Sequence, residues 1–280
     1  MSPPLSPCGA IVRRDDPDRF LCALFAPEAA REALFTLYAF NAALASVRDA
    51  VTEPALGLIR LQWWRETVEE ASHGRFRRHE VAEPLGRLIV QKELDPALLD
   101  AVITAREAEF AEEGIPDPPA LEAYAAGTAG GLMRLALAVL GAETPAAVAA
   151  ARYAGTVYGL AGILRAAPVA AARGRTLLPR VLLRREGVRV ADLARRPVGE
   201  GARRVVRAIV ELADSHAATL RGLLPEVPRA AVPALLPAAL GVRTLGRLRG
   251  AGVVPGEARV AGPRLGALWA VARMAWTGRV

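Results

Sequence analysis

The stretch LFTLYAFNAALASVRDAVTEPALGLIRLQWWRE, residues 34–66, indicates two consecutive helices. Its apolar residues recur at three- and four-residue steps, as Leu34, Leu37, Leu44 and Val51 do, and this spacing places them on roughly one face of a helix. Pro54 interrupts the pattern, and a second amphipathic run follows it. We therefore predict one helix over residues 27–51 and another over residues 57–72, each with one face buried.

The rest of the chain has the same helical character, because Ala, Leu, Arg and Glu dominate it and alternating β-branched runs are scarce. Further helices are expected at 80–92, 96–113, 119–140, 145–166, 201–224, 228–248 and 262–276, with breaks that include Pro54, Gly141 and Pro168. No break is long or polar enough to be a domain linker. The sequence predicts an all-α fold with a single domain over residues 1–280, of which residues 1–10 are mobile.

The net charge of +7 comes almost entirely from arginine, because Lys92 is the only lysine. A basic surface suits nucleic acid, anionic lipid or a phosphorylated substrate. The arginines are scattered, aromatic residues make up only 5% of the chain, and no nucleic-acid-binding signature appears, so no nucleic-acid partner is expected. No apolar run reaches the roughly 18 residues of a membrane span, which leaves at most peripheral membrane contact. With only two cysteines and no secretory signal, we expect a cytoplasmic protein, and peripheral location at the inner membrane stays open.

Conventional metal-binding patterns are weak in this sequence. The three histidines, His73, His79 and His216, lack ligand spacing, so they are interpreted as surface or capping residues and no metal site is predicted from them. Asp49 and Glu53 lie four residues apart, as two carboxylates binding one cation would on a helical face. Pro54 follows directly, however, and favours a solvated helix end. Gly127, Gly130 and Gly131 are interpreted either as a close approach between helices or as a functional feature.

The segment RLQWWRE, residues 60–66, contains two of the four tryptophans side by side. Adjacent helical residues point about 100° apart, so one indole can fill the core while the other lines a groove or a partner surface. The alternative is that both rings pack at the edge of the core beneath arginine side chains. The partner surface predicted here consists of Arg60, Gln62, Trp64 and Arg65.

Four segments together resemble the squalene/phytoene synthase family: RRDDPDRFLCALFAP, the stretch quoted above, YAAGTAGGLMRLALAVLG and YGLAGILRAAPVAAARGRTLLP. The similarity runs from about residue 10 to the C-terminus. It implies an isoprenoid synthase-type helical bundle around a central cavity. Active members join two prenyl diphosphates head to head, using Mg²⁺ held by two aspartate-rich motifs on facing helices. Carboxylates suit this role because they hold hard cations that offset the charge of the departing diphosphate.

The residues that correspond to those motifs depart from the family pattern. In YAFNAALASVRD the paired aspartate positions are Ala45 and Ser46, and only Asp49 keeps a carboxylate. In ILRAAPVAAARGRTLLP the two aspartate positions are Ala166 and Ala170, the tyrosine position is Leu177, and Arg165 and Arg175 remain. A single carboxylate cannot hold a magnesium cluster. The resemblance therefore implies that prenyl-transfer chemistry is lost and that no cofactor is expected.

The phrase between Phe40 and Trp64 resembles one subgroup of the family, which contains a mitochondrial respiratory complex I assembly factor and its bacterial relatives. This resemblance implies a non-catalytic protein that assists complex I assembly, with complex I subunits or assembly intermediates as partners. Two alternatives stay open: an active head-to-head prenyltransferase that uses Mg²⁺, and a helical interaction scaffold. For an isoprenoid-like or diphosphate ligand, the residues expected at the cavity are Tyr38, Asp49, Arg165 and Arg175.

Overall fold

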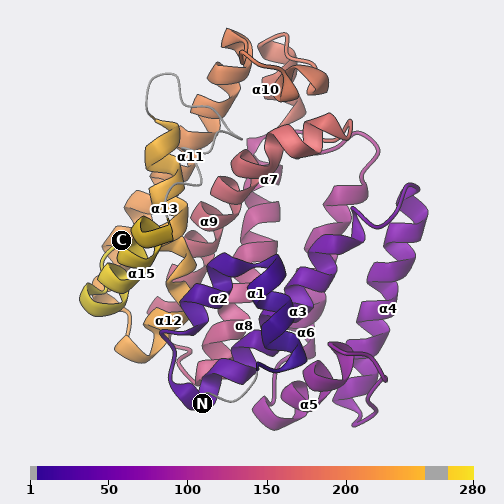
Figure 1. Cartoon of the computed structure of the whole chain (residues 1–280), viewed down its shortest axis with the longest axis vertical. Helices are drawn as coiled ribbons and strands as arrows, with labels where there is room; N and C mark the ends of the chain where they lie inside the picture. The colour runs from indigo at the N-terminus through magenta and orange to yellow at the C-terminus, as the bar shows by residue number, and fades with distance from the viewer. Residues whose placement is uncertain (1–4, 250–263) are drawn as a thin grey trace.

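The computed structural model describes residues 5–249 and 264–280, and within them the regular elements are all helical (Figure 1). The α-helices are α1 (Pro7–Asp15), α2 (Pro17–Ala23), α3 (Glu28–Val47), α4 (Pro54–Ser72), α5 (Ala82–Lys92), α6 (Pro96–Ala105), α7 (Pro118–Ala125), α8 (Gly131–Leu140), α9 (Pro145–Ala172), α10 (Arg180–Arg185), α11 (Glu200–Leu223), α12 (Val232–Leu235), α13 (Pro237–Leu248) and α15 (Arg264–Thr277). Short turns of other helix types are η1 (Arg106–Phe110), η2 (Ala126–Gly130), η3 (Val190–Ala194), η4 (Leu224–Glu226) and η5 (Arg229–Ala231). The prediction of an all-α fold is confirmed.

Several helices begin where a polar residue precedes a proline. The side chains of Ser6, Asp16, Asp95, Asp117 and Thr144 each accept a hydrogen bond from a backbone N–H in the first turn of α1, α2, α6, α7 and α9. Proline fits the first turn because its missing N–H would have no helical partner there. These local signals explain why the helix starts match the sequence pattern closely.

Helix α9 is the central element and packs against α7, α8, α11 and α13. It crosses the η2 turn very closely at Gly155, where an added Cβ atom would lie 2.2 Å from the Cα of Gly130. Gly127 and Gly131 face Ala105 and Val102 in the same tight way. The interpretation of these glycines as a close approach between helices is therefore confirmed, and it fixes α9 against the α7–α8 segment.

The sequence prediction did not include α1, α2 and α10, and three further differences bear on the site. Helix α9 runs through Pro168 to Ala172, because Leu164, Ala167 and Ala171 bury that turn and packing compensates for the backbone hydrogen bond that proline lacks. Helix α3 ends at Val47, so Asp49 lies in the following turn and not on a helical face with Glu53. Residues 7–10 belong to α1 with Cys8 buried, contrary to a mobile segment over residues 1–10.

The core consists of two clusters of buried side chains. One is built mainly from α3, α4, α5, α6, α8 and the first half of α9, and the other from the second half of α9 with α7, α11 and the end of α13. The helices α3 and α4 lie on one side of the molecule and α11 and α13 on the other (Figure 1). The second half of α9 and the end of α3 border the space between them.

Candidate functional site

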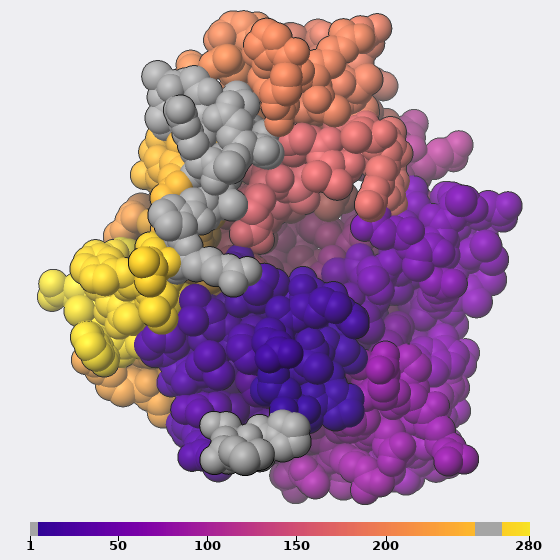
Figure 2. All heavy atoms as spheres, in the orientation of Figure 1, coloured from indigo at the N-terminus to yellow at the C-terminus, as the bar shows by residue number. Residues whose placement is uncertain are grey.

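A cavity of about 910 Å³ opens between the end of α3, the second half of α9, the α1–α2 junction, and the η1 and η2 turns. Figure 2 shows the surface hollowed where the N-terminal helices, the purple α3–α4 region and the salmon α9 segment meet. The positions that correspond to both aspartate-rich motifs line this one cavity. The expectation that these two segments face each other therefore matches the geometry.

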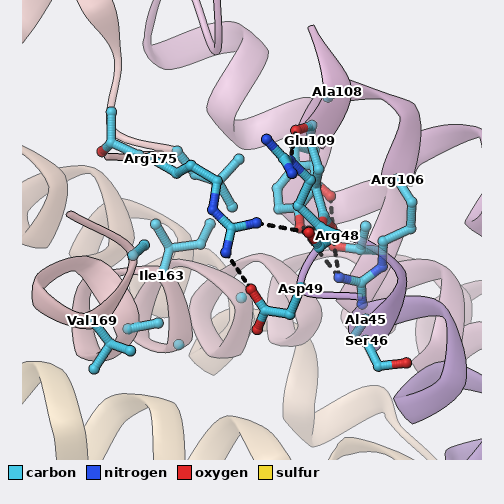
Figure 3. A pocket seen from close by; sticks show the side chains of 18 of the residues that line it. Ala45, Ser46, Arg48, Asp49, Arg106, Ala108, Glu109, Ile163, Val169 and Arg175 are labelled. Carbon is cyan, nitrogen blue, oxygen red and sulfur yellow. Dashed lines mark hydrogen bonds and ion pairs between the residues drawn. The ribbon is translucent and has the colours of Figure 1, made fainter. Parts of the chain in front are cut away.

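The α3 side of the cavity carries Ala45, Ser46 and Asp49 (Figure 3). Ala45 has no polar side-chain atom. The hydroxyl of Ser46 donates to the carbonyl oxygen of Ala43 at 2.7 Å, a bond within its own helix turn. Asp49 is thus the one carboxylate among the three first-motif positions.

The α9 side forms an apolar strip. Gly162, Ile163, Ala166, Val169 and Ala170 line the cavity at helical spacing, and Leu177 follows in the next segment. Val169 is 59% exposed and borders the cavity. The motif positions Ala166 and Ala170 on this side therefore offer no metal ligand, and the charged groups here are Arg165 and Arg173.

Asp49 is held by two arginines. The Nη1 atom of Arg173 lies 2.8 Å from Asp49 Oδ1, and Arg175 donates to the same carboxylate oxygen from Nη2. Arg175 also donates from Nη1 to the carbonyl oxygen of Arg48 at 2.8 Å (Figure 3). Partial burial raises the pKa of Asp49, but the two guanidinium groups outweigh that effect and hold its pKa below the ordinary value.

Arg165 makes a different pair from the one at Asp49. Its Nη1 atom donates to Oδ2 of Asp18 at 2.9 Å, and the Tyr158 hydroxyl lies 3.5 Å from the same oxygen. Burial lowers the pKa of Arg165, but the surrounding Tyr158 and Asp18 raise it further, so the guanidinium stays charged. The sequence gives no signal for this partner, since 147 residues separate Arg165 and Asp18.

A buried polar cluster at the floor of the cavity also escaped the sequence analysis. Arg106 donates to Asn41 Oδ1 at 3.0 Å and to Glu109 Oε1 at 2.8 Å, and the Tyr124 hydroxyl donates to Glu109 Oε1 at 2.6 Å. Burial raises the pKa of Tyr124, which keeps the phenol protonated as a donor. Arg106 and Glu109 are three residues apart in η1, but Asn41 comes from α3 and Tyr124 from α7, and no sequence spacing connects these two to the pair.

Arg19 forms a second buried centre beside the first. It pairs with Asp16 at 2.7 Å, and its guanidinium lies 4.7 Å from the Tyr158 ring centroid and 5.9 Å from that of Tyr38. Tyr38 is only 2% exposed and does not line the cavity, so it lies behind Arg19 and not at the ligand side as expected. The Nε atoms of Arg19 and Arg106 are buried donors without a hydrogen-bond partner.

The donor set does not fit a magnesium cluster. Seven carboxylates and six arginines line the cavity. Six of the seven carboxylates form ion pairs with arginine, namely Asp15, Asp16, Asp18, Asp49, Glu109 and Glu113. No group of three or more His, Cys, Asp or Glu side chains that could hold a metal ion occurs within residues 5–249 and 264–280. A carboxylate shared with a guanidinium is a poor ligand for a hard cation, because the pairing already offsets its charge.

The four residues predicted as a partner surface have different environments. Trp64 is 5% exposed and packs edge-on against Phe40, so most of its ring is buried, although it also borders the groove described next. Trp63 is the more exposed indole, and with Arg60 and His79 it lines a groove of about 330 Å³. Arg65 bonds Asp100, Thr104 and Glu107 and thereby ties α4 to α6 and η1. Arg60 and Gln62 are exposed.

The all-helical architecture and the cavity between α3 and α9 are those of an isoprenoid synthase-type protein. Squalene synthase HpnC from Alicyclobacillus acidocaldarius is similar with a TM-score of 0.75 at 21% identity, covering 89% of this chain and 94% of that one. A dehydrosqualene synthase solved in complex with a ligand gives a TM-score of 0.77 at 18% identity, covering 96% and 95%. The squalene/phytoene synthase family model matches residues 12–264, and the chain belongs to this family.

Relatives with higher sequence identity are named as assembly factors of complex I. The NADH dehydrogenase (ubiquinone) complex I assembly factor 6 of Homo sapiens is 32% identical over 229 residues, which cover 82% of this chain and 69% of the relative. The Drosophila melanogaster homologue is 28% identical over 230 residues, covering 79% and 68%. The sequence identity to these two assembly factors is thus higher than the sequence identity to the two synthases, which share the fold.

Proposed function

We propose that this chain is a non-catalytic member of the squalene/phytoene synthase family that assists assembly of the respiratory NADH dehydrogenase, complex I. The observation that carries the proposal is the cavity in which alanines and a serine replace metal ligands and the remaining Asp49 is paired with Arg173 and Arg175. The naming of the 32%-identical relatives as complex I assembly factors supports it. Its partners are then complex I subunits or assembly intermediates, and no catalytic cofactor is needed.

Deletion of the gene provides the test. Native gels and NADH–quinone oxidoreductase activity should show less assembled complex I in the deletion strain, while extracted isoprenoids stay unchanged. The wild-type gene and an Asp49→Ala variant should both restore assembly, because Asp49 has no catalytic duty in this proposal. Unchanged complex I in the deletion strain would refute it.

The alternative, an active prenyltransferase, is favoured by one observation: Arg165 and Arg175 are retained and line a cavity large enough for a prenyl chain. In that case the deletion strain would lack an isoprenoid product, and Asp49→Ala would fail to restore it. The isoprenoid profile therefore distinguishes the two functions. An isoprenoid-like ligand bound without chemistry is compatible with the first proposal, because the α9 wall of the cavity is apolar.

The proposal places the protein in the cytoplasm with peripheral contact at the inner membrane, where complex I is assembled. Two helical stretches, Pro118–Leu140 and Pro145–Ala172, are long and apolar enough to cross a membrane by length and composition. In each, 61% of the most apolar segment is buried within the structure, as is usual for core helices of a folded domain. Peripheral contact with the membrane would therefore use a surface other than these two buried helical stretches.

A further inference from the structure

Helix α15 has an inner face in the core and an outer face that is strongly apolar. Val271 and Met274 are fully buried, and the helix packs against α12 and α13. On the other side Leu265 is 79%, Trp269 67% and Trp276 80% exposed. Figure 2 shows α15, in yellow, on the outer flank of the molecule, away from the hollow of the cavity.

The exposed apolar residues share one helical face. Counted from Leu265, the other three residues lie three, four and eleven positions further on, at Leu268, Trp269 and Trp276. At 100° per residue, these spacings keep all four side chains within about 100° of arc around the helix. Two of the four tryptophans in the chain lie on this face. The family model ends at residue 264, where α15 begins. We define the α15 face as these four residues.

The excess basic charge of the chain lies in the part of the sequence that contains α15. Residues 227–280 contain eight arginines and one acidic residue, Glu257, and their net charge of +7 equals that of the whole chain. Residues 1–226 are formally neutral, with 28 basic and 28 acidic residues. Beside α15, the Arg273 guanidinium lies 5.8 Å from the Trp269 ring centroid, and Arg229 donates to the carbonyl oxygen of Ala275 at 3.3 Å.

We propose that the α15 face docks on the surface of an anionic lipid bilayer. Tryptophan and leucine enter the boundary between headgroups and acyl chains, and flanking arginines bind lipid phosphates. An anionic bilayer therefore accommodates both the apolar α15 face and the arginines beside it. Nucleic acid would use the arginines and leave the leucines in water. A second copy of the chain would bring two like-charged segments together.

The α15 face would be the surface that makes the peripheral membrane contact stated under the proposed function, but lipid binding does not depend on a role in complex I assembly. Vesicle binding by the purified chain and complex I levels in a deletion strain are separate measurements, so either can fail alone.

The test is co-sedimentation of the full chain with vesicles of phosphatidylcholine and phosphatidylglycerol at 7:3, and with phosphatidylcholine alone. Binding should be stronger to the anionic vesicles and should weaken as salt rises. Replacing both Trp269 and Trp276 with serine should lower the affinity by about tenfold or more. A matched control, Leu56→Ser with Ile59→Ser on the exposed side of α4, should bind as wild type does.

The charge contribution is tested separately. Arg273→Gln with Arg279→Gln should lower the affinity for anionic vesicles about fivefold per arginine, since each contributes on the order of 1 kcal/mol near such a surface. The control pair Arg184→Gln and Arg185→Gln, exposed residues of α10, should change it little. Circular dichroism confirms that each variant is folded.

Three results would overturn the proposal. The first is a wild-type chain that binds neither vesicle, and the second is unchanged affinity in the tryptophan variant. The third is that duplex DNA abolishes vesicle binding, and that either DNA binding or self-association depends on the same α15 residues.

Discussion

Arg165 donates a hydrogen bond to Asp18 at 2.9 Å across the mouth of the cavity, although 147 residues separate the two in sequence. The pair joins the second half of α9 to the N-terminal helix α2. The guanidinium of Arg165, which is retained next to a motif position, thus pairs with a carboxylate of its own chain. The Asp49–Arg175 pair does the same on the opposite side.

Releasing these arginines should create an anion site. The double variant Asp18→Asn with Asp49→Asn leaves Arg165, Arg173 and Arg175 without their carboxylate partners. Inorganic pyrophosphate at about ten times its Kd should then raise the Tm of the variant by roughly 2–4 °C. Differential scanning calorimetry of the wild type at the same concentration should show a smaller rise. Equal shifts in both proteins would mean that the pairs do not limit anion binding.

Asp49 should make stability depend on pH in one direction. Because its folded-state pKa lies below the ordinary value of 3.8, the ionised form stabilises the fold at pH values above 3.8, and the contribution is lost as the pH falls through the lower folded pKa. The side chain is 57% exposed, so the expected loss in Asp49→Asn at pH 7 is about 0.5–1 kcal/mol. Urea denaturation at pH 7 and pH 3 should show the difference from wild type shrinking at the lower pH. A difference that grows on acidification would contradict the pairing.

The buried cluster around Arg106 should matter more for stability than the Asp49 pairs. Glu109→Gln removes the charge that faces Arg106, and both side chains are about nine-tenths buried. Leaving a buried guanidinium without its carboxylate costs about 3 kcal/mol or more. Glu112→Gln on the same rim, where the side chain is exposed, should change the free energy of unfolding by less than about 0.5 kcal/mol. Similar losses in both variants, measured by urea denaturation, would argue against a structural role for the cluster.

Two glycines of α9 should respond in opposite ways to alanine. At Gly155 the added Cβ atom would lie 2.2 Å from the backbone of Gly130, so the crossing must open at a cost of about 1–3 kcal/mol or more. At Gly162 nothing lies within 4 Å of the new atom, and Gly162→Ala should stabilise the helix by about 0.5–1 kcal/mol. Thermal unfolding of the two variants checks the sign of each change. A stabilised Gly155→Ala variant would contradict the close approach.

The helical pattern made most of the fold predictable. The caps and prolines that start α6, α7 and α9 are local, and local signals can be read in one sequence. The run through Pro168 was not predictable in this way, because it depends on the burial of Leu164, Ala167 and Ala171 against distant helices.

Some residues of the candidate site could be predicted from the sequence and others could not. The motif positions Ala45, Ala166 and Ala170 could be located from the family resemblance, and they line one cavity. The Asp18–Arg165 pair and the Arg106 cluster could not, since their members meet only after several helices have packed. The burial of Trp64 and the exposure of Trp63 depend on the rotation of α4 against α3, which sequence spacing left open.

With alanine at positions 45, 166 and 170, the cavity should no longer support prenyl transfer. The most direct measurement is pyrophosphate release on incubation with farnesyl or geranylgeranyl diphosphate and Mg²⁺, with an active squalene synthase as positive control. Release by the wild-type chain should be no greater than that of its Asp49→Ala variant, and no condensation product should be extractable. Magnesium-dependent release by the wild type above that variant, with a head-to-head product, would contradict it.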